Sequence, residues 1–244
     1  MAAETTAPIS SDDHSPVAPV WHTILFIAVF VVLLLLSVRT VRNLPAHGDR
    51  FRLYAVSVVS EIAMVLYVWL LGLRLRGKTM RELIGGKWSR ASDVLMDIAI
   101  AILFWIAVIA VLAVLRFVLH TNGPSALRDI KPLLPQSGAE MAAYVVLSVT
   151  AGFCEEFLFR GYLQREFLAW TRIPAAAVVL QAVVFGFGHL YQGWRNAVAI
   201  AVYGAMFGIL ALIRKSLRPG MIQHAMQDSF AGVVGSLLAR RGYF

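Results

Sequence analysis

The sequence has few charged residues and a single cysteine. Of its 244 residues, 15% are charged and 59% are hydrophobic, whereas soluble domains carry about a quarter charged residues. The mean hydropathy is +0.72. The lone Cys154 excludes a disulfide within the chain. These shortages exclude an ordinary soluble domain and a disulfide scaffold, and they indicate a protein that crosses a membrane several times.

Acidic residues are scarce as well, with 14 Asp and Glu against 22 Lys and Arg. Basic residues of membrane proteins gather in loops and at helix ends, where they contact lipid headgroups. We therefore assign the net charge of +8 to contact with membrane lipid and predict no binding of nucleic acid. The first 20 residues are rich in Ala, Thr, Ser, Pro and Asp and lack a basic start, so we expect a disordered tail and a retained first apolar segment.

Seven apolar segments come near the roughly 20 residues that cross about 30 Å of hydrocarbon. They lie at 22–38, 54–73, 94–119, 140–158, 174–190, 196–213 and 219–239. The sequence therefore predicts an all-α, polytopic transmembrane helical bundle of about seven spans, within a range of six to eight. Three intervals are predicted outside the spans: 74–93 as a basic loop or interfacial helix, 120–138 as a loop, and 160–173 as an interfacial turn.

Ionisable side chains lie inside or at the ends of the later apolar segments. Charged groups at membrane depth are costly, so each indicates a function. Three of them end the fourth segment, one lies near the end of the fifth, and two lie one turn apart in the seventh. In chain order they are Glu155, Glu156, Arg160, His189, His224 and Asp228.

The spacing of these residues predicts different roles for the two adjacent glutamates. Glu156 and Arg160 are four residues apart, so they share a helix face and can form an ion pair. Glu155 is rotated from its neighbour by about 100° on a helix of 3.6 residues per turn. It has no such partner and is available as a general base. His224 and Asp228 also share a face, so the aspartate can orient the imidazole or stand beside it. We expect Glu155, His189, His224 and Asp228 to converge on one water molecule, which is hydrolase chemistry.

Three ordered motifs carry a resemblance to a known family. They are "EEFLFR" (155–160), "FGFGH" (185–189) and "HAMQD" (224–228). This set resembles the CAAX prenyl protease and bacteriocin-processing (Abi, or CPBP) family over roughly residues 90–240. The resemblance implies an intramembrane endopeptidase, a helical bundle and a cavity open to the cytosol. It divides the chain into a tail (1–20), two N-terminal spans with a basic interfacial segment (21–90) and a catalytic helical core (91–244).

The resemblance also implies roles for the motif residues. Glu155 and His189 would activate water, and His224 and Asp228 would stabilise the oxyanion or hold the geometry. The supporting residues would be Glu156, Arg160 and Phe185. Asp228 departs from the eukaryotic branch, which has Asn there, and an ionised Asp cannot donate a hydrogen bond to an oxyanion.

Two mechanisms stay open at this point, with or without a metal ion. We favour a site with no cofactor, in which a glutamate activates the water. Zinc remains possible, because two His with carboxylates form an acceptable ligand set. The ligands would then be Glu155, His189, His224 and Asp228.

The expected partners are a peptide or lipidated protein substrate and membrane lipid. The expected location is the inner (plasma) membrane, crossed several times, with the cavity facing the cytoplasm. This orientation follows from the resemblance, because the basic residues divide almost evenly between the two sides and the positive-inside rule does not decide. The alternatives are a proton-coupled transporter, which buried Glu, His and Asp would also suit, and a non-catalytic immunity or scaffold protein.

Three further residues and one pair complete the predictions. Cys154 is expected to be a small packing residue. Glu61 and Asp97 could extend a proton path, but we favour pairing with arginines of the loops. Gly204 and Gly208 form a small-xxx-small pair, which indicates helix packing.

Overall fold

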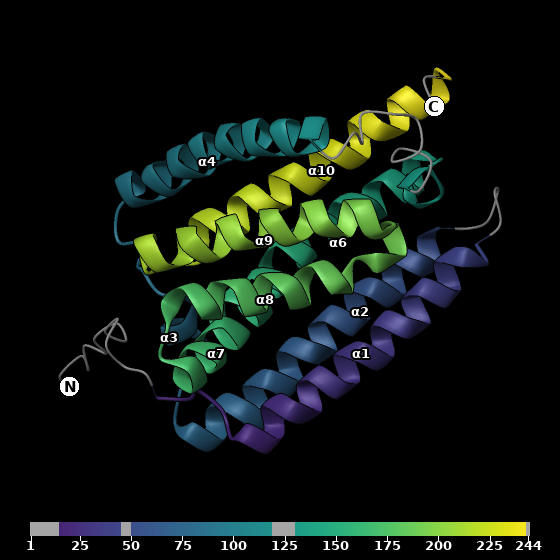
Figure 1. Cartoon of the computed structure of the whole chain (residues 1–244). Coiled ribbons are helices and arrows are strands. Elements are labelled where there is room, and N and C mark those ends of the chain that lie inside the picture. Colours follow the sequence, from purple (N-terminus) through teal and green to yellow (C-terminus); the bar gives the residue numbers. More distant parts are fainter. Residues whose placement is uncertain (1–14, 45–49, 119–129, 243–244) are drawn as a thin grey trace.

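The fold is a bundle of helices, shown in Figure 1. The computed structural model describes residues 15–44, 50–118 and 130–242. Within these ranges the regular secondary structure is helical, and the β-pairing consists of one isolated antiparallel bridge between Gly85 and Ser216. The expectation of an all-α bundle is confirmed. Residues 1–14 of the predicted tail and most of the predicted loop 120–138 lie outside the described residues.

Each of the seven apolar segments lies in a helix. The helices are α1 (Val20–Arg42), α2 (Phe51–Tyr67), α4 (Ala91–Val118), α6 (Gly138–Glu155), α8 (Pro174–Gly188), α9 (Trp194–Arg214) and α10 (Arg218–Arg240). A π-helix (Val68–Leu73) and a 3₁₀ turn (Arg74–Arg76) extend α2.

Five helical stretches are long and apolar enough to cross a membrane. They are Val20–Arg42, Phe51–Arg76, Ala91–Leu115, Gly138–Thr171 and Trp194–Arg214. Helix α8 is apolar but shorter. A multi-pass membrane bundle is therefore shown, and the number of about seven crossings stays a prediction.

The basic interval after α2 contains a short helix, as the sequence allowed. Helix α3 (Met80–Ile84) begins after Thr79, whose hydroxyl accepts a hydrogen bond from the amide of Glu82, while the Glu82 carboxylate accepts one from the amide of Thr79. This capping box satisfies two amides that a helix start leaves without partners.

The prediction of an interfacial turn at 160–173 is wrong. The chain stays helical from Gly138 to Thr171, through a π-helix (Glu156–Leu163) and α7 (Gln164–Thr171). Arg160, Gln164 and Glu166 are buried and bonded inside the bundle, so the polarity of this stretch did not indicate solvent. The helix ends at Arg172, which adopts a left-handed conformation with φ of 60°, and Pro174 begins α8.

Glycines allow the site-bearing helices to approach closely. A Cβ on Gly152 of α6 would lie 2.7 Å from the amide nitrogen of Ala225 in α10. A Cβ on Gly186 of α8 would lie 2.7 Å from the carbonyl oxygen of Ala197 in α9. These contacts bring α6 beside α10 and α8 beside α9, with α2 on the other side of α6.

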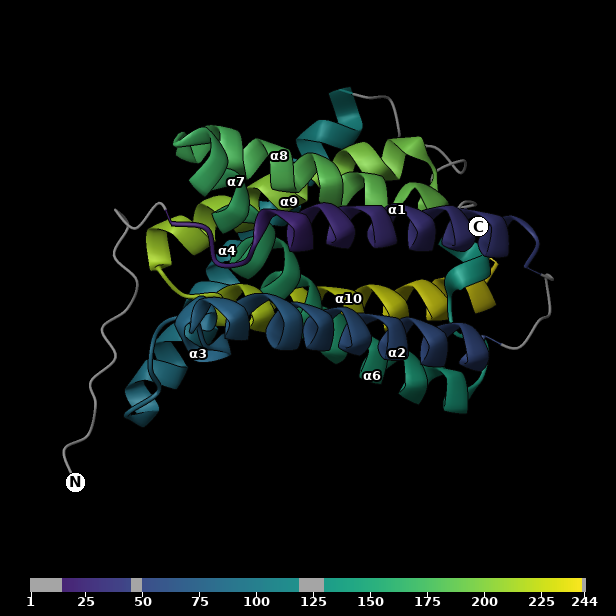
Figure 2. The same cartoon turned by 90° about the horizontal axis from the view of Figure 1, so that it is seen from below.

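Helix α1 is attached to the bundle through its N-terminal end. The Glu166 carboxylate of α7 accepts hydrogen bonds from the amides of Val17 and Ala18 and from the Thr23 hydroxyl. Further along, α1 contacts α8 and the segment 190–192, and it meets the extension of α2 at the π-helix Val68–Leu73. In Figure 2 α1 and α2 lie antiparallel to each other, with a separation between their ribbons.

Candidate active site

The deepest part of the site is the ion pair between Glu156 and Arg160. Both side chains are buried, and Nη1 of Arg160 donates to Oε1 of Glu156 at 2.9 Å. Its Nη2 donates to the carbonyl of Gly204 at 3.1 Å. The guanidinium also lies 4.3 Å from the ring centre of Phe185. A buried cation needs such compensation, because leaving water costs several kcal/mol per ion. The ion pair expected from the spacing is present.

Glu156 also orients His224 of α10. Nδ1 of His224 lies 3.0 Å from Oε1 of Glu156 and, since a carboxylate can only accept, Nδ1 donates. Nε2 of His224 therefore faces the other way. It lies 3.5 Å from Oε2 of Glu155 and 3.6 Å from Oδ2 of Asp228. Asp228 thus stands beside the ring, and the residue that orients the ring is Glu156.

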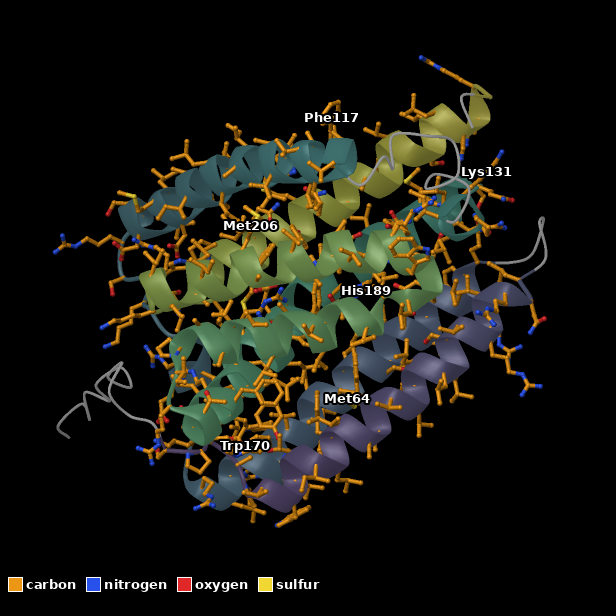
Figure 3. The ribbon with its side chains drawn as sticks, viewed as in Figure 1. Met64, Phe117, Lys131, Trp170, His189 and Met206 are labelled. Carbon is orange, nitrogen blue, oxygen red and sulfur yellow. The ribbon has the colours of Figure 1, made fainter. Side chains whose placement is uncertain are left out.

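His189 is held by its own helix. At the end of α8 its Nδ1 lies 2.9 Å from the carbonyl oxygen of Phe185, to which it donates. The last carbonyls of a helix have no amide partner within it, so this acceptor is available. Nε2 of His189 is left facing Glu155, 4.0 Å from Oε1. Figure 3 labels His189 at this end of α8. Phe185 therefore has two roles. Its ring covers the Arg160 guanidinium, and its carbonyl oxygen, four residues before His189, orients the His189 ring.

Glu155 lies between the two imidazoles. One carboxylate oxygen faces Nε2 of His189 and the other faces Nε2 of His224. The Glu155 side chain is 18% exposed and that of Asp228 is 36% exposed, whereas that of Glu156 is 1% exposed. The structure thus brings together the four residues expected to converge, from α6, the end of α8 and α10.

Glutamines behind the site did not stand out in the sequence. Gln181 of α8 donates to the carbonyl of Gly204 at 3.0 Å, and Gln164 of α7 donates to the carbonyl of Gly208 at 3.1 Å. The glycine pair of α9 therefore serves for helix packing, as expected, and also presents backbone acceptors to its neighbours. Tyr203 of the same helix lies with its ring centre 5.8 Å from that of His224. The available signal was Gln181 inside the otherwise apolar stretch 174–188.

Tyr191 follows His189 closely and stacks on it, with ring centres 5.8 Å apart. Burial raises the pKa of the Tyr191 hydroxyl above its ordinary value, so the group stays a neutral hydrogen-bond donor.

Comparison with known proteins identifies the part of the chain that holds this site. Residues 137–230 match the family model described as Type II CAAX prenyl endopeptidase Rce1-like. This segment, called the Rce1-like segment below, is similar to that family. No curated protein and no solved structure matches the chain. The Rce1-like segment contains all three motifs, and the match confirms the family resemblance. It supports a membrane-embedded protease of the CAAX type, with a peptide or prenylated protein as the general class of substrate.

The Rce1-like segment contains side chains of the types that bind zinc. The donor types suit zinc, because both Nε2 atoms and the Glu155 carboxylate face one another. However, in the part of the chain that the structure describes, no group of three or more His, Cys, Asp or Glu side chains is arranged to hold a metal ion. We therefore derive no catalytic step through a metal.

Three residues near the Rce1-like segment or within it can now be placed. Cys154 is buried and unpaired, in keeping with a packing role. Asp97 lies 3.7 Å from the guanidinium of Arg214 and accepts a hydrogen bond from the indole of Trp88, so it pairs with an arginine as expected. Glu61 does not. Within the described residues it forms no ion pair with an arginine or lysine, because α2 turns it towards Glu155.

Proposed function

We propose that the protein is an intramembrane endopeptidase that hydrolyses a peptide bond in a membrane-associated or lipidated peptide, with Glu155 as general base. The observation that carries this proposal is the division of labour between adjacent glutamates. Glu156 is committed to Arg160 and His224, whereas Glu155 presents its carboxylate to two imidazole Nε2 atoms.

In the proposed reaction a water lies between Glu155 and His189. Glu155 takes one proton from the water as its oxygen attacks the peptide carbonyl carbon. The carbonyl oxygen becomes negatively charged in the tetrahedral intermediate. In its protonated form His224 donates from Nε2 to this oxygen while its Nδ1 stays bonded to Glu156. The proton held by Glu155 then passes to the leaving nitrogen as the carbon–nitrogen bond breaks, which yields an acid and an amine.

Asp228 is proposed to hold the geometry of the site. Its Oδ2 lies 3.6 Å from Nε2 of His224. A protonated Asp228 could donate to the oxyanion as an asparagine does, whereas an ionised one supports the charge of His224. Asp228→Asn separates the two roles, since it keeps a donor and removes the charge.

The experiment that tests the proposal compares peptide termini in membranes that contain the wild type or Glu155→Gln. New termini should depend on Glu155, and the purified variant should cleave the identified peptide about 10²- to 10⁴-fold more slowly, as expected for loss of a general base. Glu82→Gln is the matched control, because Glu82 lies in α3 and outside the Rce1-like segment. Cleavage at the wild-type rate by both Glu155→Gln and His189→Ala would remove the basis for the proposal.

The location proposed for this activity is the inner (plasma) membrane, with the site open to the cytoplasm. Support comes from the five long apolar helices and from the cytosolic cavity that the resemblance implies. Cysteines introduced at Asn43 and at Arg76, at opposite ends of the first helix pair, test the orientation. A membrane-impermeant thiol reagent applied to intact cells should label position 76 poorly and position 43 well if the start of α1 faces the cytoplasm. The reverse pattern would contradict this orientation.

A further inference from the structure

A cavity lies beside Glu155, and neither imidazole is among the residues that line it. It has a volume of about 120 Å³ and is lined by residues of α1 and α2, by the end of α6 and the π-helix that follows it, and by Gly188 at the end of α8. Its walls are mostly apolar, and its polar lining consists of Ser37, Ser60, Glu61 and Glu155. Glu61 and Met64 lie one turn apart on α2, and Figure 3 labels Met64 on that helix. Glu155 thus lines this cavity and also faces the two imidazoles.

Two carboxylates that line this cavity have unmet hydrogen-bonding capacity. Oε2 of Glu61 and Oε2 of Glu155 are both buried, and neither forms a hydrogen bond with the described residues. Oε2 of Glu155 lies 3.5 Å from Nε2 of His224, whereas Oε2 of Glu61 is left for water. The Glu61 carboxyl group interacts electrostatically with Glu155, His224 and Asp228, so it lies close enough to affect the charges of the proposed active site.

The cavity has the size and the polar groups that bound water requires. A buried water needs about 10–15 Å³ of cavity space and two to four polar partners, so the space of about 120 Å³ admits several. Apolar walls alone would stay dry, whereas two carboxylates and two hydroxyls supply the partners. Buried polar atoms are nearly always satisfied in proteins, by ordered water where no side chain reaches them.

We propose that Glu61 is a positioning residue that holds, with Ser60, the water supplied to Glu155 for hydrolysis. This inference rests on the proposed function, because each peptide bond hydrolysed consumes one water in a region surrounded by hydrocarbon. Glu61 acts through water on Glu155 and does not touch the peptide. It lies on α2, outside the Rce1-like segment, so this part of the site comes from the N-terminal spans.

The kinetic test compares Glu61→Gln, Glu61→Leu and the outward-facing control Ile62→Ala on the peptide that the wild type cleaves. Glutamine still binds water, so Glu61→Gln should keep kcat within about threefold. Leucine cannot, so Glu61→Leu should lower kcat at least tenfold with KM unchanged. A role in folding or substrate binding would change KM or the yield of both variants. Wild-type kcat in Glu61→Leu overturns the proposal.

An infrared measurement tests the shared water without requiring activity. The carboxyl or carboxylate band that is lost in Glu61→Gln belongs to Glu61. If a water joins the two groups, that band shifts in Glu155→Gln and responds to exchange of the buffer into D₂O. If the Glu61 band neither shifts in Glu155→Gln nor responds to D₂O, the proposal is overturned, even when the wild type cleaves its peptide. Absence of cleavage by the wild type, with the band shift present, would instead refute the proposed function.

Discussion

Arg160→Met should strongly destabilise the fold, because it leaves the buried Glu156 carboxylate without its cationic partner. Arg160 is 2% exposed, and its removal leaves the buried Glu156 carboxylate with His224 as its remaining hydrogen-bond partner. Breaking a buried ion pair by removing one partner costs about 3–5 kcal/mol. Since about 1.4 kcal/mol is a tenfold change, the folded population should fall by roughly two to three and a half powers of ten relative to the unfolded one.

The double variant Glu156→Leu, Arg160→Met separates the ion pair from the chemistry. Replacing both charges by apolar side chains is often neutral or stabilising. Nδ1 of His224 then loses its acceptor, which costs about 1–3 kcal/mol. We therefore expect the double variant to be more stable than Arg160→Met, yet inactive, because nothing orients the imidazole.

Both variants can be measured by reversible unfolding in mixed micelles, with increasing sodium dodecyl sulfate and tryptophan fluorescence as the signal. Arg81→Met serves as the control, since Arg81 is exposed on α3 and surface charges contribute about 0–1 kcal/mol. If Arg160→Met unfolds at the same detergent fraction as the control, the argument that the pair is buried and interdependent does not hold.

Three further outcomes are expected. Gly186→Ala should cost about 1–3 kcal/mol in the same unfolding assay, because its Cβ would meet the backbone of α9, whereas Gly138→Ala, with nothing within 4 Å, should be neutral or stabilising; equal effects would contradict the packing. Glu166→Leu should speed hydrogen exchange of the Val17 and Ala18 amides, which lose their acceptor; unchanged exchange would show another anchor. Purified protein treated with a chelator should keep its peptidase activity, and stoichiometric zinc whose removal abolishes cleavage would exclude the metal-free reaction.

The sequence was sufficient for properties that depend on one segment at a time. Apolar length predicted the helices, and the spacing of four residues predicted the ion pair of Glu156 with Arg160, because neighbours on a helix are set by its pitch. The motif order also placed the site residues on the right helices.

Properties that depend on the register between helices could not be predicted. Whether Glu156 or Asp228 orients His224 depends on how far α10 slides along α6, which no spacing within a helix records. The turn predicted at 160–173 failed for a related reason, since Gln164 and Glu166 find partners on other helices. Glu61 likewise could be assigned to the site only once α2 was seen beside α6.

The residues that line the cavity beside Glu155 come from two parts of the chain that can vary in sequence independently. Eight of its twelve lining residues come from α1 and α2, and the other four come from the Rce1-like segment, which also holds the proposed chemical groups. A chimaera that exchanges residues 15–76 for those of a relative would therefore change most of the cavity wall and keep the reacting groups. Selectivity could in this way be re-engineered, or drift during evolution, without a single change to the motifs.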